Sequence, residues 1–200
     1  MTHFFDRTLL QILYNFHWVA PGAARSAQPY IGGWRRFLKD GGIRAIVNLR
    51  GVHENLSWWR QEMAACAAMD IRHYDIAFNS RVLPRAEQLE NLIGFFEDAP
   101  RPILIKCSGG QDRSSFVSAL YILHTQGWAA FDTAQGQFAR FPYLHLPKHD
   151  QHWLRHFFLY AREKADGMPI SQWAPHFSSE DFAGWLGQHG LADSYKRRKI

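Results

Sequence analysis

The chain has 200 residues, of which 46% are apolar and 15% aromatic, so it can bury the core of a globular domain and is not a disordered protein. Its apolar runs are too short and too often interrupted for a transmembrane helix, and its N-terminal segment lacks the basic start of a signal peptide. Two cysteines, Cys66 and Cys107, exclude a framework of disulfides. Basic residues outnumber acidic ones by 23 to 18, which suits a phosphorylated or otherwise anionic partner.

Short apolar runs alternate with longer amphipathic ones along the first two thirds of the chain. The short runs predict strands at residues 16–20, 43–49, 71–78 and 102–106. The longer ones predict helices at residues 8–14, 34–39, 57–69, 85–98 and 114–125. This alternation is typical of an α/β fold with a central, mostly parallel sheet flanked by helices.

The last third of the chain is predicted to be helical throughout, at residues 129–138, 150–165 and 178–188. Its large aromatic side chains are expected to form core rather than a binding surface. They are Trp153, Phe157, Phe158, Trp173, Phe177 and Trp185. We expect an α/β domain over residues 1–165, a helical extension packed on it over residues 166–195, and a basic tail at residues 196–200. The tail is interpreted as a solvated C-terminus, with contact to nucleic acid or a membrane as the alternative.

Three further expectations concern individual helix residues. Ser57 and Asp150 stand where they can cap the helices that follow them. Glu62 is expected on the exposed face of the helix at residues 57–69. Cys66, among four alanines of the same helix, is interpreted as a small packed residue, and a redox partnership with Cys107 is the alternative.

The stretch at residues 103–115 carries the strongest chemical signal. It reads as a strand, a loop with two glycines, and a helix, with Cys107 and Arg113 at the two ends of the loop. Such a loop gathers backbone N–H groups, and the helix N-terminus adds partial positive charge. Arg113 can donate two parallel hydrogen bonds to an oxyanion, and this field lowers the pKa of a thiol. The stretch therefore predicts an anion site that faces a nucleophilic thiolate.

This loop resembles that of the cysteine-dependent protein tyrosine and dual-specificity phosphatases, especially small bacterial members with a C-x-x-G-x-D-R loop. The matching residues are Cys107, Ser108, Gly109, Gly110, Gln111, Asp112 and Arg113. The resemblance covers about residues 15–140, and the segment at residues 25–29 resembles an R-S-x-Q-P motif of the same proteins. Two positions depart from the pattern, because Lys106 stands in place of a usual His and Ser115 in place of a frequent Gly.

The resemblance implies a phosphatase that hydrolyses phosphomonoesters of a protein or a small molecule through a phosphocysteine on Cys107. Arg113 would hold two oxygens of the phosphoryl group. The predicted phosphate-binding residues are Ser108, Gly109, Gly110, Gln111, Asp112, Arg113 and Ser114. The Ser114 hydroxyl would bond the sulfur, and a plain helix-terminal hydroxyl is the alternative. No metal, organic cofactor or nucleic acid is expected, and a reactive thiol favours the cytoplasm.

The general acid is the missing part, since the loop at residues 79–84 holds no carboxylate. Asp112 is the preferred candidate, although it is equally able to shape the loop by bonding backbone amides. Asp75, on the strand at residues 71–78, is the second candidate, and its alternative is a structural brace. Arg50 follows a strand end and is a secondary phosphate contact. Arg25 either braces the loop or lies on the surface.

Two rival functions remain open. One is a weakly active or inactive module that binds phosphorylated ligands. The other is different anion-thiol chemistry, namely arsenate reduction or sulfur transfer. A separate cluster of histidines raises the alternative of a metal site, although no Cys or paired carboxylate completes it. The cluster comprises His145, His149, His152 and His156.

Overall fold

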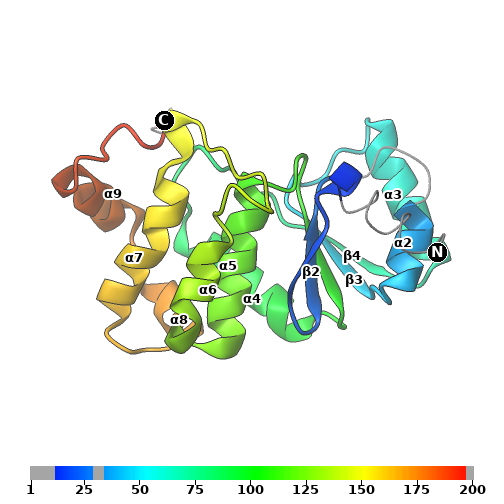
Figure 1. The fold of residues 1–200 in the computed structure, drawn as a ribbon, viewed down its shortest axis with the longest axis horizontal. Coiled ribbons are helices and arrows are strands. Elements are labelled where there is room, and N and C mark those ends of the chain that lie inside the picture. Colours follow the sequence, from blue (N-terminus) through cyan, green and yellow to red (C-terminus); the bar gives the residue numbers. More distant parts are fainter. Residues whose placement is uncertain (1–11, 29–33, 197–200) are drawn as a thin grey trace. The chain divides into compact units, whose positions relative to one another are not determined.

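The computed structural model describes residues 12–28 and 34–196, and the chain divides into two compact units (Figure 1). Unit 1 comprises Met1–Ala77 and Asp98–Ser114, and unit 2 comprises Phe78–Glu97 and Ser115–Ile200. Most of the predicted helix at residues 8–14, Pro29 of the R-S-x-Q-P segment and residues 197–200 of the tail lie outside the described residues. The predicted domain at residues 1–165, with a helical extension at residues 166–195 packed on it, stays a prediction.

Unit 1 is built on a five-stranded sheet in the order β1-β2-β5-β3-β4. The strands are β1 (His17–Ala20), β2 (Ala23–Ser26), β3 (Ala45–Asn48), β4 (Arg72–Asp75) and β5 (Ile103–Lys106). Among the described residues, the β1–β2 pair is antiparallel and the other three pairs are parallel. Strands β2, β3 and β5 are buried along their whole length, as short continuous runs in parallel sheets usually are. The mostly parallel sheet flanked by helices is the predicted fold class.

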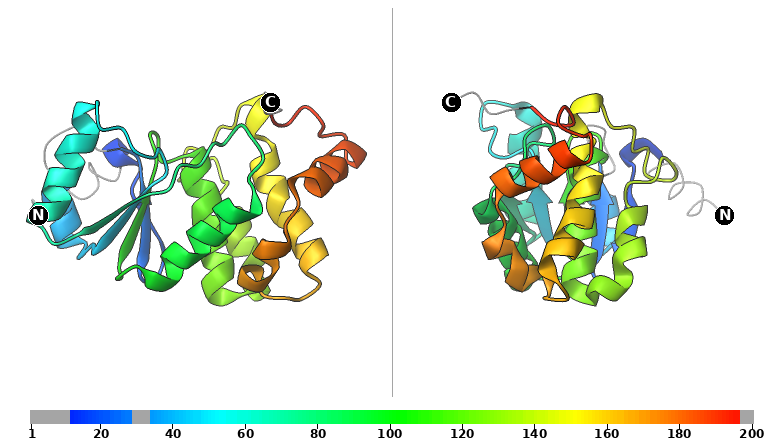
Figure 2. Two further views of the ribbon diagram at one scale, coloured as in Figure 1. Left: turned by 180° about the vertical axis from the view of Figure 1, so that it is seen from behind. Right: turned by 90° about the vertical axis from the view of Figure 1, so that its left-hand side faces the viewer.

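Helices α2 (Trp34–Asp40) and α3 (Ser57–Ala68) lie along one face of this sheet (Figures 1 and 2). Apolar residues of both helices and of the sheet share one buried cluster, which includes Leu38, Ile46 and Leu104. Cys66 belongs to the same cluster, which confirms its prediction as a packed residue. The cap predicted at Ser57 is wrong, because the helix begins at Ser57 itself and its N-cap, Leu56, offers no side-chain acceptor.

Polar residues form one row at the carboxyl ends of the parallel strands. Lys106 of β5 pairs in register with Asn48 of β3, and Asn48 pairs with Asp75 of β4. Ser26 of β2 pairs with Lys106 from the other side. The strand predicted at residues 71–78 ends early, at Asp75. Because ligands bind beyond the carboxyl ends of such strands, this row lies at the edge of the sheet where chemistry is expected.

Unit 2 is helical. Its helices are α4 (Ala86–Asp98), α5 (Asp112–Gln126), α6 (Phe131–Gly136), α7 (Trp153–Ala165), α8 (Ile170–Trp173) and α9 (Ser179–Gln188), with short 3-10 turns at Trp128–Ala130, His149–Gln151 and Ala174–His176. The first three residues of α5 belong to unit 1. Asp150 does not cap α7, because it lies within a 3-10 turn and His152 occupies the N-cap position. Ser178 caps α9 by accepting the Asp181 amide at 3.1 Å.

Aromatic side chains fill the interior of unit 2. The Phe157 ring lies at its centre, with the Phe116 ring 5.0 Å away and the Phe177 ring 5.3 Å away. Trp153 is fully buried and donates its indole N–H to the Ser80 carbonyl at 2.9 Å. Of the six aromatics predicted as core, five are buried and Trp185 is half-buried. The apolar pattern therefore predicted this interior correctly.

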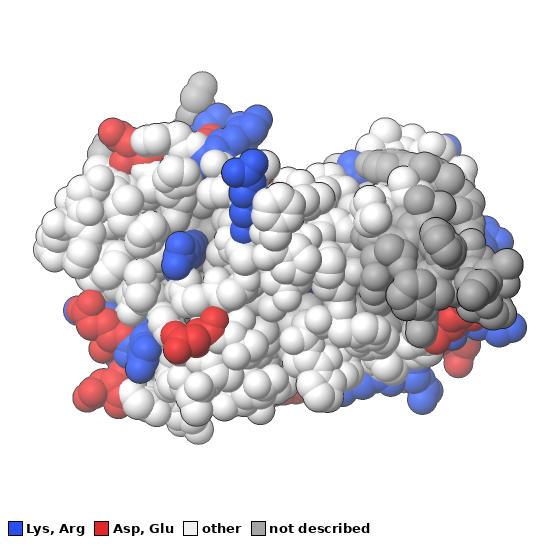
Figure 3. Space-filling model, in the orientation of Figure 1, with Lys and Arg blue, Asp and Glu red and all other residues white. Residues whose placement is uncertain are grey.

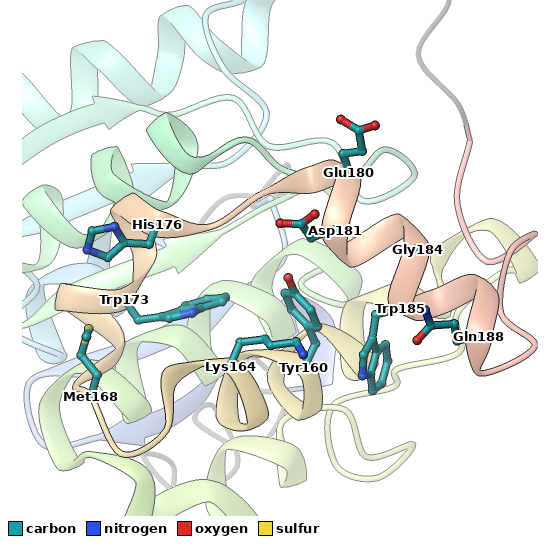
Figure 4. A pocket seen from close by; sticks show the side chains of 10 residues that line it. All are labelled: Tyr160, Lys164, Met168, Trp173, His176, Glu180, Asp181, Gly184, Trp185 and Gln188. Carbon is teal, nitrogen blue, oxygen red and sulfur yellow. The ribbon is translucent and has the colours of Figure 1, made fainter.

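A cavity of about 670 Å³ opens among α7, α8 and α9 (Figure 4). Tyr160 and Trp173 line it, and the Asp181 carboxylate lies toward the Tyr160 hydroxyl, whereas Glu180 points away. Burial, and then the charges of Asp181 and Glu163, raise the pKa of Tyr160. None of the predicted site residues lines this cavity. Over the described ranges of the chain, no helix is long and apolar enough to cross a membrane.

Candidate active site

Cys107 stands at the point where β5 ends, and α5 begins five residues later at Asp112. Its side chain is 3% exposed, at the base of the loop between strand and helix. The Ser114 hydroxyl, in the first turn of α5, donates to the Cys107 sulfur at 3.2 Å. The contact predicted for Ser114 is therefore present, and a thiolate formed here has a hydrogen-bond donor beside it.

The surroundings of Cys107 favour the thiolate. Burial by itself raises the pKa of a thiol, but the positive charge of Arg113 and the hydrogen bond from Ser114 outweigh it. The backbone N–H groups of Ser114 and Gln111 act in the same direction, so the pKa of Cys107 lies below its usual value. This is the combination of cation and helix N-terminus that activates a nucleophilic cysteine.

The carbonyl groups of the loop are bound from outside the loop. Those of Ser108, Gly109, Gly110 and Gln111 all accept hydrogen bonds. The donors are the backbone amide of Gln28 and the side chains of Asn15 and Arg25. The C=O and the following N–H of a planar trans peptide point in opposite directions. The N–H groups of residues 109–112 therefore face the other way, into the loop, where they can bind an anion.

Arg25 and Asn15 supply most of these contacts. Arg25 is fully buried and donates to the carbonyls of Gly110 at 2.7 Å and Gln111 at 3.2 Å, so it braces the loop and is not a surface residue. The Asn15 amide reaches the carbonyls of Gly109 at 3.2 Å and Gly110 at 3.0 Å. Sequence reasoning missed Asn15, because more than ninety residues separate it from the loop and no spacing rule connects the two.

The loop also depends on the absence of a side chain at Gly110. This residue has a φ of +63°, and a Cβ there would lie 2.5 Å from the Ala27 backbone nitrogen. A Cβ at Gly109 would instead have ordinary contacts, the nearest at 3.5 Å on the Gln111 side chain. Gly110 is therefore needed both for the left-handed turn and for the close approach of the segment after β2.

The Arg113 guanidinium is held by two acceptors. It donates to the Leu49 carbonyl, just after β3, at 3.1 Å and to the Ser108 hydroxyl at 3.2 Å. These bonds orient the planar fork of donors while the side chain stays half-exposed. Asp112 precedes it as the first, half-buried residue of α5.

Asp75 is engaged in contacts within unit 1. Both carboxylate oxygens accept hydrogen bonds, from Asn48 Nδ2 at 2.6 Å and from Trp59 Nε1 at 3.1 and 3.2 Å. Asp75 therefore ties β4 to β3 and α3, which favours the structural alternative for this residue. Arg50 follows β3 and stacks on Trp58, with its guanidinium carbon 3.8 Å from a ring centroid.

Glu62 corrects a prediction, because it is buried at 1% exposure and not on an exposed face. It forms an ion pair with Lys106 at 2.7 Å and also accepts from Gln28 and contacts His73, both at 2.7 Å. Burial alone would raise the pKa of Glu62, but these partners, His73 and Lys106 foremost, lower it below its usual value. Burial lowers the pKa of Lys106, although Glu62 opposes that shift. Helical periodicity failed here because α3 faces the polar row of the sheet.

The remaining candidates take no part in this site. Cys66 is buried at 2% exposure, and burial raises the pKa of its thiol to about 12, so the thiol is a poor partner in redox chemistry. In the part of the chain that the structure describes, no three His, Cys, Asp or Glu side chains gather in a way that could hold a metal ion. His145 of the predicted histidine cluster instead contacts the Phe138 carbonyl at 3.2 Å.

Charged side chains are dispersed over the face of the molecule that Figure 3 draws. On the face drawn in Figure 3, the described Lys and Arg residues stand singly or in small groups, with acidic residues and uncharged surface between them. The positive charges identified beside Cys107 are the Arg113 guanidinium and the N–H groups at the first turn of α5.

Comparisons with known proteins rest on structure alone. No family model matches the chain, and no curated protein sequence does. Among solved structures, TpbA of P. aeruginosa has a TM-score of 0.58 and 15% identity over 83% of this chain and 93% of its own. A mutant form of Tk-PTP has a TM-score of 0.57 and 16% identity, over 75% of this chain and 97% of its own. The core catalytic domain of the PP-IP phosphatase SIW14 from S. cerevisiae has a TM-score of 0.54 and 16% identity, over 88% and 93%.

The identities of 15–16% are low, so these matches support a likeness of fold and not of individual residues. The chain therefore has the fold of the protein tyrosine and dual-specificity phosphatases.

Proposed function

We propose that the protein is a cysteine-dependent phosphatase that hydrolyses phosphomonoesters through a phosphocysteine on Cys107. One observation carries this proposal. A buried thiol of lowered pKa shares a loop with Arg113 and with N–H groups that are turned inward. A phosphate ester bound in such a loop would have its phosphorus within reach of the Cys107 thiolate.

In the first step, the Cys107 thiolate attacks phosphorus and the bond between phosphorus and the ester oxygen breaks. Arg113 and the loop N–H groups bind the non-bridging oxygens and stabilise the charge that develops on them. The leaving oxygen takes a proton from a general acid, so the alcohol departs neutral.

In the second step, water attacks the phosphocysteine and the bond between phosphorus and sulfur breaks, which releases phosphate. The general acid, now a carboxylate, accepts the proton of the attacking water. The Ser114 hydroxyl, 3.2 Å from the sulfur, stabilises the departing thiolate.

We assign the general acid to Asp112. Asp112 is the first residue of α5 and directly precedes Arg113, which supports this assignment. Asp75, the other candidate, already accepts hydrogen bonds on both oxygens from Asn48 and Trp59. Its carboxylate would have to leave these partners to reach a substrate.

We expect the substrate to be a phosphorylated protein or a small phosphorylated molecule. No basic residue stands between Cys107 and Arg113, which disfavours a highly phosphorylated lipid headgroup. Arg50, stacked on Trp58 next to the Leu49 carbonyl that holds Arg113, is the proposed secondary contact. A reaction that needs a free thiolate also favours a reducing compartment such as the cytoplasm.

Hydrolysis of p-nitrophenyl phosphate, measured from about pH 5 to about pH 8, tests the proposal. The wild-type protein is expected to turn over this substrate, and Cys107→Ser is expected to abolish turnover. A rapid quench should leave one phosphoryl group on the peptide that contains Cys107, detected by mass spectrometry. Turnover that persists in Cys107→Ser would refute the nucleophile.

The same pH series separates the two candidate acids. A general acid must be protonated, so its loss removes the fall in rate on the basic side of the profile. We expect that change in Asp112→Asn and not in Asp75→Asn. The opposite result would transfer the role to Asp75.

The rival functions give different outcomes in these experiments. Binding of phosphate without turnover at any pH would identify a phosphate-binding module. A persulfide on Cys107 would identify sulfur transfer. Arsenate reduction normally recruits a further cysteine, and Cys66 is ill suited to that part because it is buried and its pKa is raised.

A further inference from the structure

The Lys106 ammonium is buried one residue before the candidate nucleophile. Together with its hydrogen-bond partners Gln28, Asn48 and Glu62 it forms a cluster that we call the hub. Lys106 is 1% exposed and donates to Gln28 Oε1 at 2.7 Å and to Asn48 Oδ1 at 3.0 Å, beside its ion pair with Glu62. An ammonium has three donors, and these three acceptors use all of them. The direction of the side chain is therefore completely specified.

The partners of Lys106 lead to both acceptors that hold the Arg113 guanidinium. The Gln28 backbone amide donates to the carbonyl of Ser108, whose hydroxyl accepts from Arg113. Asn48 immediately precedes Leu49, whose carbonyl also accepts from Arg113 and whose amide donates to the Lys106 carbonyl. Side chain and main chain of Lys106 thus connect the segments on either side of the loop.

From these contacts we propose that Lys106, held by Glu62, is a positioning residue for Arg113. Its ammonium is bound by Gln28, Asn48 and Glu62, and it acts by keeping the Ser108 and Leu49 acceptors at the separation that the guanidinium fork requires. The consequence for catalysis rests on the proposed function. The contacts themselves predict only that anion binding depends on Lys106 and Glu62.

If Lys106 and Glu62 served only to stabilise the fold, a different experimental result would be expected. Buried ion pairs contribute little net stability compared with apolar residues of similar size, and their directional bonds mainly determine geometry. Loss of the hub should therefore change the anion site in protein that is still folded. A stabilising role would lower the melting temperature and leave the anion affinity of folded protein unchanged.

The test is the double variant Lys106→Met/Glu62→Gln. It removes both charges together, so that neither is left uncompensated, and it keeps an amide for Gln28 and His73. The readouts are a thermal melt, the affinity for tungstate by calorimetry, and the guanidinium N–H signals of Arg113 by NMR. Tungstate is a tetrahedral oxyanion that this chemistry does not consume.

We expect the folded double variant to bind tungstate about tenfold more weakly, as losses of supporting contacts typically do, and the Arg113 signals to exchange faster with water. The matched control is Lys164→Met/Glu163→Gln, the same changes in an exposed pair whose charges lie 3.0 Å apart. The control should bind tungstate as the wild type does. Wild-type affinity in the folded Lys106 double variant would overturn the proposal.

A second variant covers the case in which the double variant does not fold. Gln28→Met removes the Oε1 that accepts from Lys106 and the Nε2 that donates to Glu62, and it leaves both charges in place. It is expected to weaken tungstate binding about threefold, because the loss of these two bonds loosens the Lys106 ammonium without burying an unpaired charge. Unchanged binding would count against the proposal. If the wild type binds tungstate but has no Cys107-dependent turnover, the proposed function fails while this test still decides the role of Lys106.

Discussion

The interiors of the two units are built from different chemistry. At the carboxyl edge of the sheet in unit 1, charged and polar side chains such as Arg25, Glu62 and Lys106 are buried and joined by hydrogen bonds. In unit 2, aromatic rings surround Phe157 and Trp153, with few polar groups among them.

This difference separates two tasks. Apolar burial is non-directional, so the aromatic interior chiefly supplies stability. Hydrogen bonds depend on angle and distance, so the polar edge holds the loop carbonyls and the Arg113 guanidinium in one arrangement. Substitutions in unit 2 should therefore change the free energy of unfolding, and substitutions at the polar edge should change anion binding and rate.

The largest expected effect lies in unit 2. Phe157→Ala should lower the free energy of unfolding by about 3–5 kcal/mol, because it opens a cavity at a fully buried ring. Turnover per folded molecule should stay near that of the wild type. Denaturant melts with activity measured on the folded fraction test this, with Phe157→Leu as the milder control. A loss of rate larger than the loss of folded protein would break the separation of tasks.

The next effect lies at the polar edge. Arg113→Ala should lower kcat by about 10²–10³-fold, which is the usual cost of removing one transition-state donor, while the melting temperature changes little. Arg113→Lys keeps the charge but lacks the bidentate fork, so it should recover only part of the rate. Steady-state kinetics at matched folded concentration provide the measurement. Full activity in the lysine variant would show that charge alone suffices.

Alanine substitutions at two neighbouring glycines test how strongly the loop depends on its backbone conformation. Gly110→Ala should cost at least about 1–2 kcal/mol from its left-handed conformation, before the contact with the Ala27 backbone adds to it. Tungstate binding should weaken at the same time. Gly109→Ala, whose Cβ has room, is the matched control. Equal stability and equal tungstate affinity in both variants would contradict the argument.

The smallest expected effect is a difference in reactivity between the two thiols as pH changes. The pKa of Cys107 is lowered in the folded protein, so its thiolate adds stability that is complete above the unfolded-state pKa and is lost as pH falls through the folded pKa. Iodoacetamide should therefore alkylate Cys107 below the ordinary thiol pKa of about 8.5. Cys66, with its pKa raised to about 12, should stay unmodified. Peptide mapping of the two sites gives the answer, and equal labelling would refute it.

Many features of this protein were predicted correctly from local sequence patterns. The strand at Ile103–Lys106, the helix after it and the mostly parallel sheet follow from apolar periodicity, which each segment carries by itself. The predicted contact of Ser114 with Cys107 is also present, because both lie within one continuous strand-loop-helix segment. The catalytic parts assigned to these residues stay predictions until turnover is measured.

Where periodicity was read alone, it failed at the polar edge. Glu62 was expected to be exposed, but α3 turns it toward Lys106. Ser57 and Asp150 were expected as caps, yet Ser57 is the first residue of α3 itself and Asp150 lies in a separate 3-10 turn before α7. A cap depends on one backbone angle, and a buried carboxylate depends on what lies opposite, and neither is encoded in local composition.

The amino-acid sequence alone thus determined most of the strands and helices, although not β2 or α8, together with the fold class and the presence of a thiol and an arginine around one anion loop. Only the tertiary structure decided what holds that loop, namely Asn15, Arg25 and Gln28 behind its carbonyls and Lys106 with Glu62 beneath it. The physical reason is that these contacts join segments far apart in the chain. Hydrogen bonds of that kind are set by the register of the strands and the packing of α3, not by any spacing along the sequence.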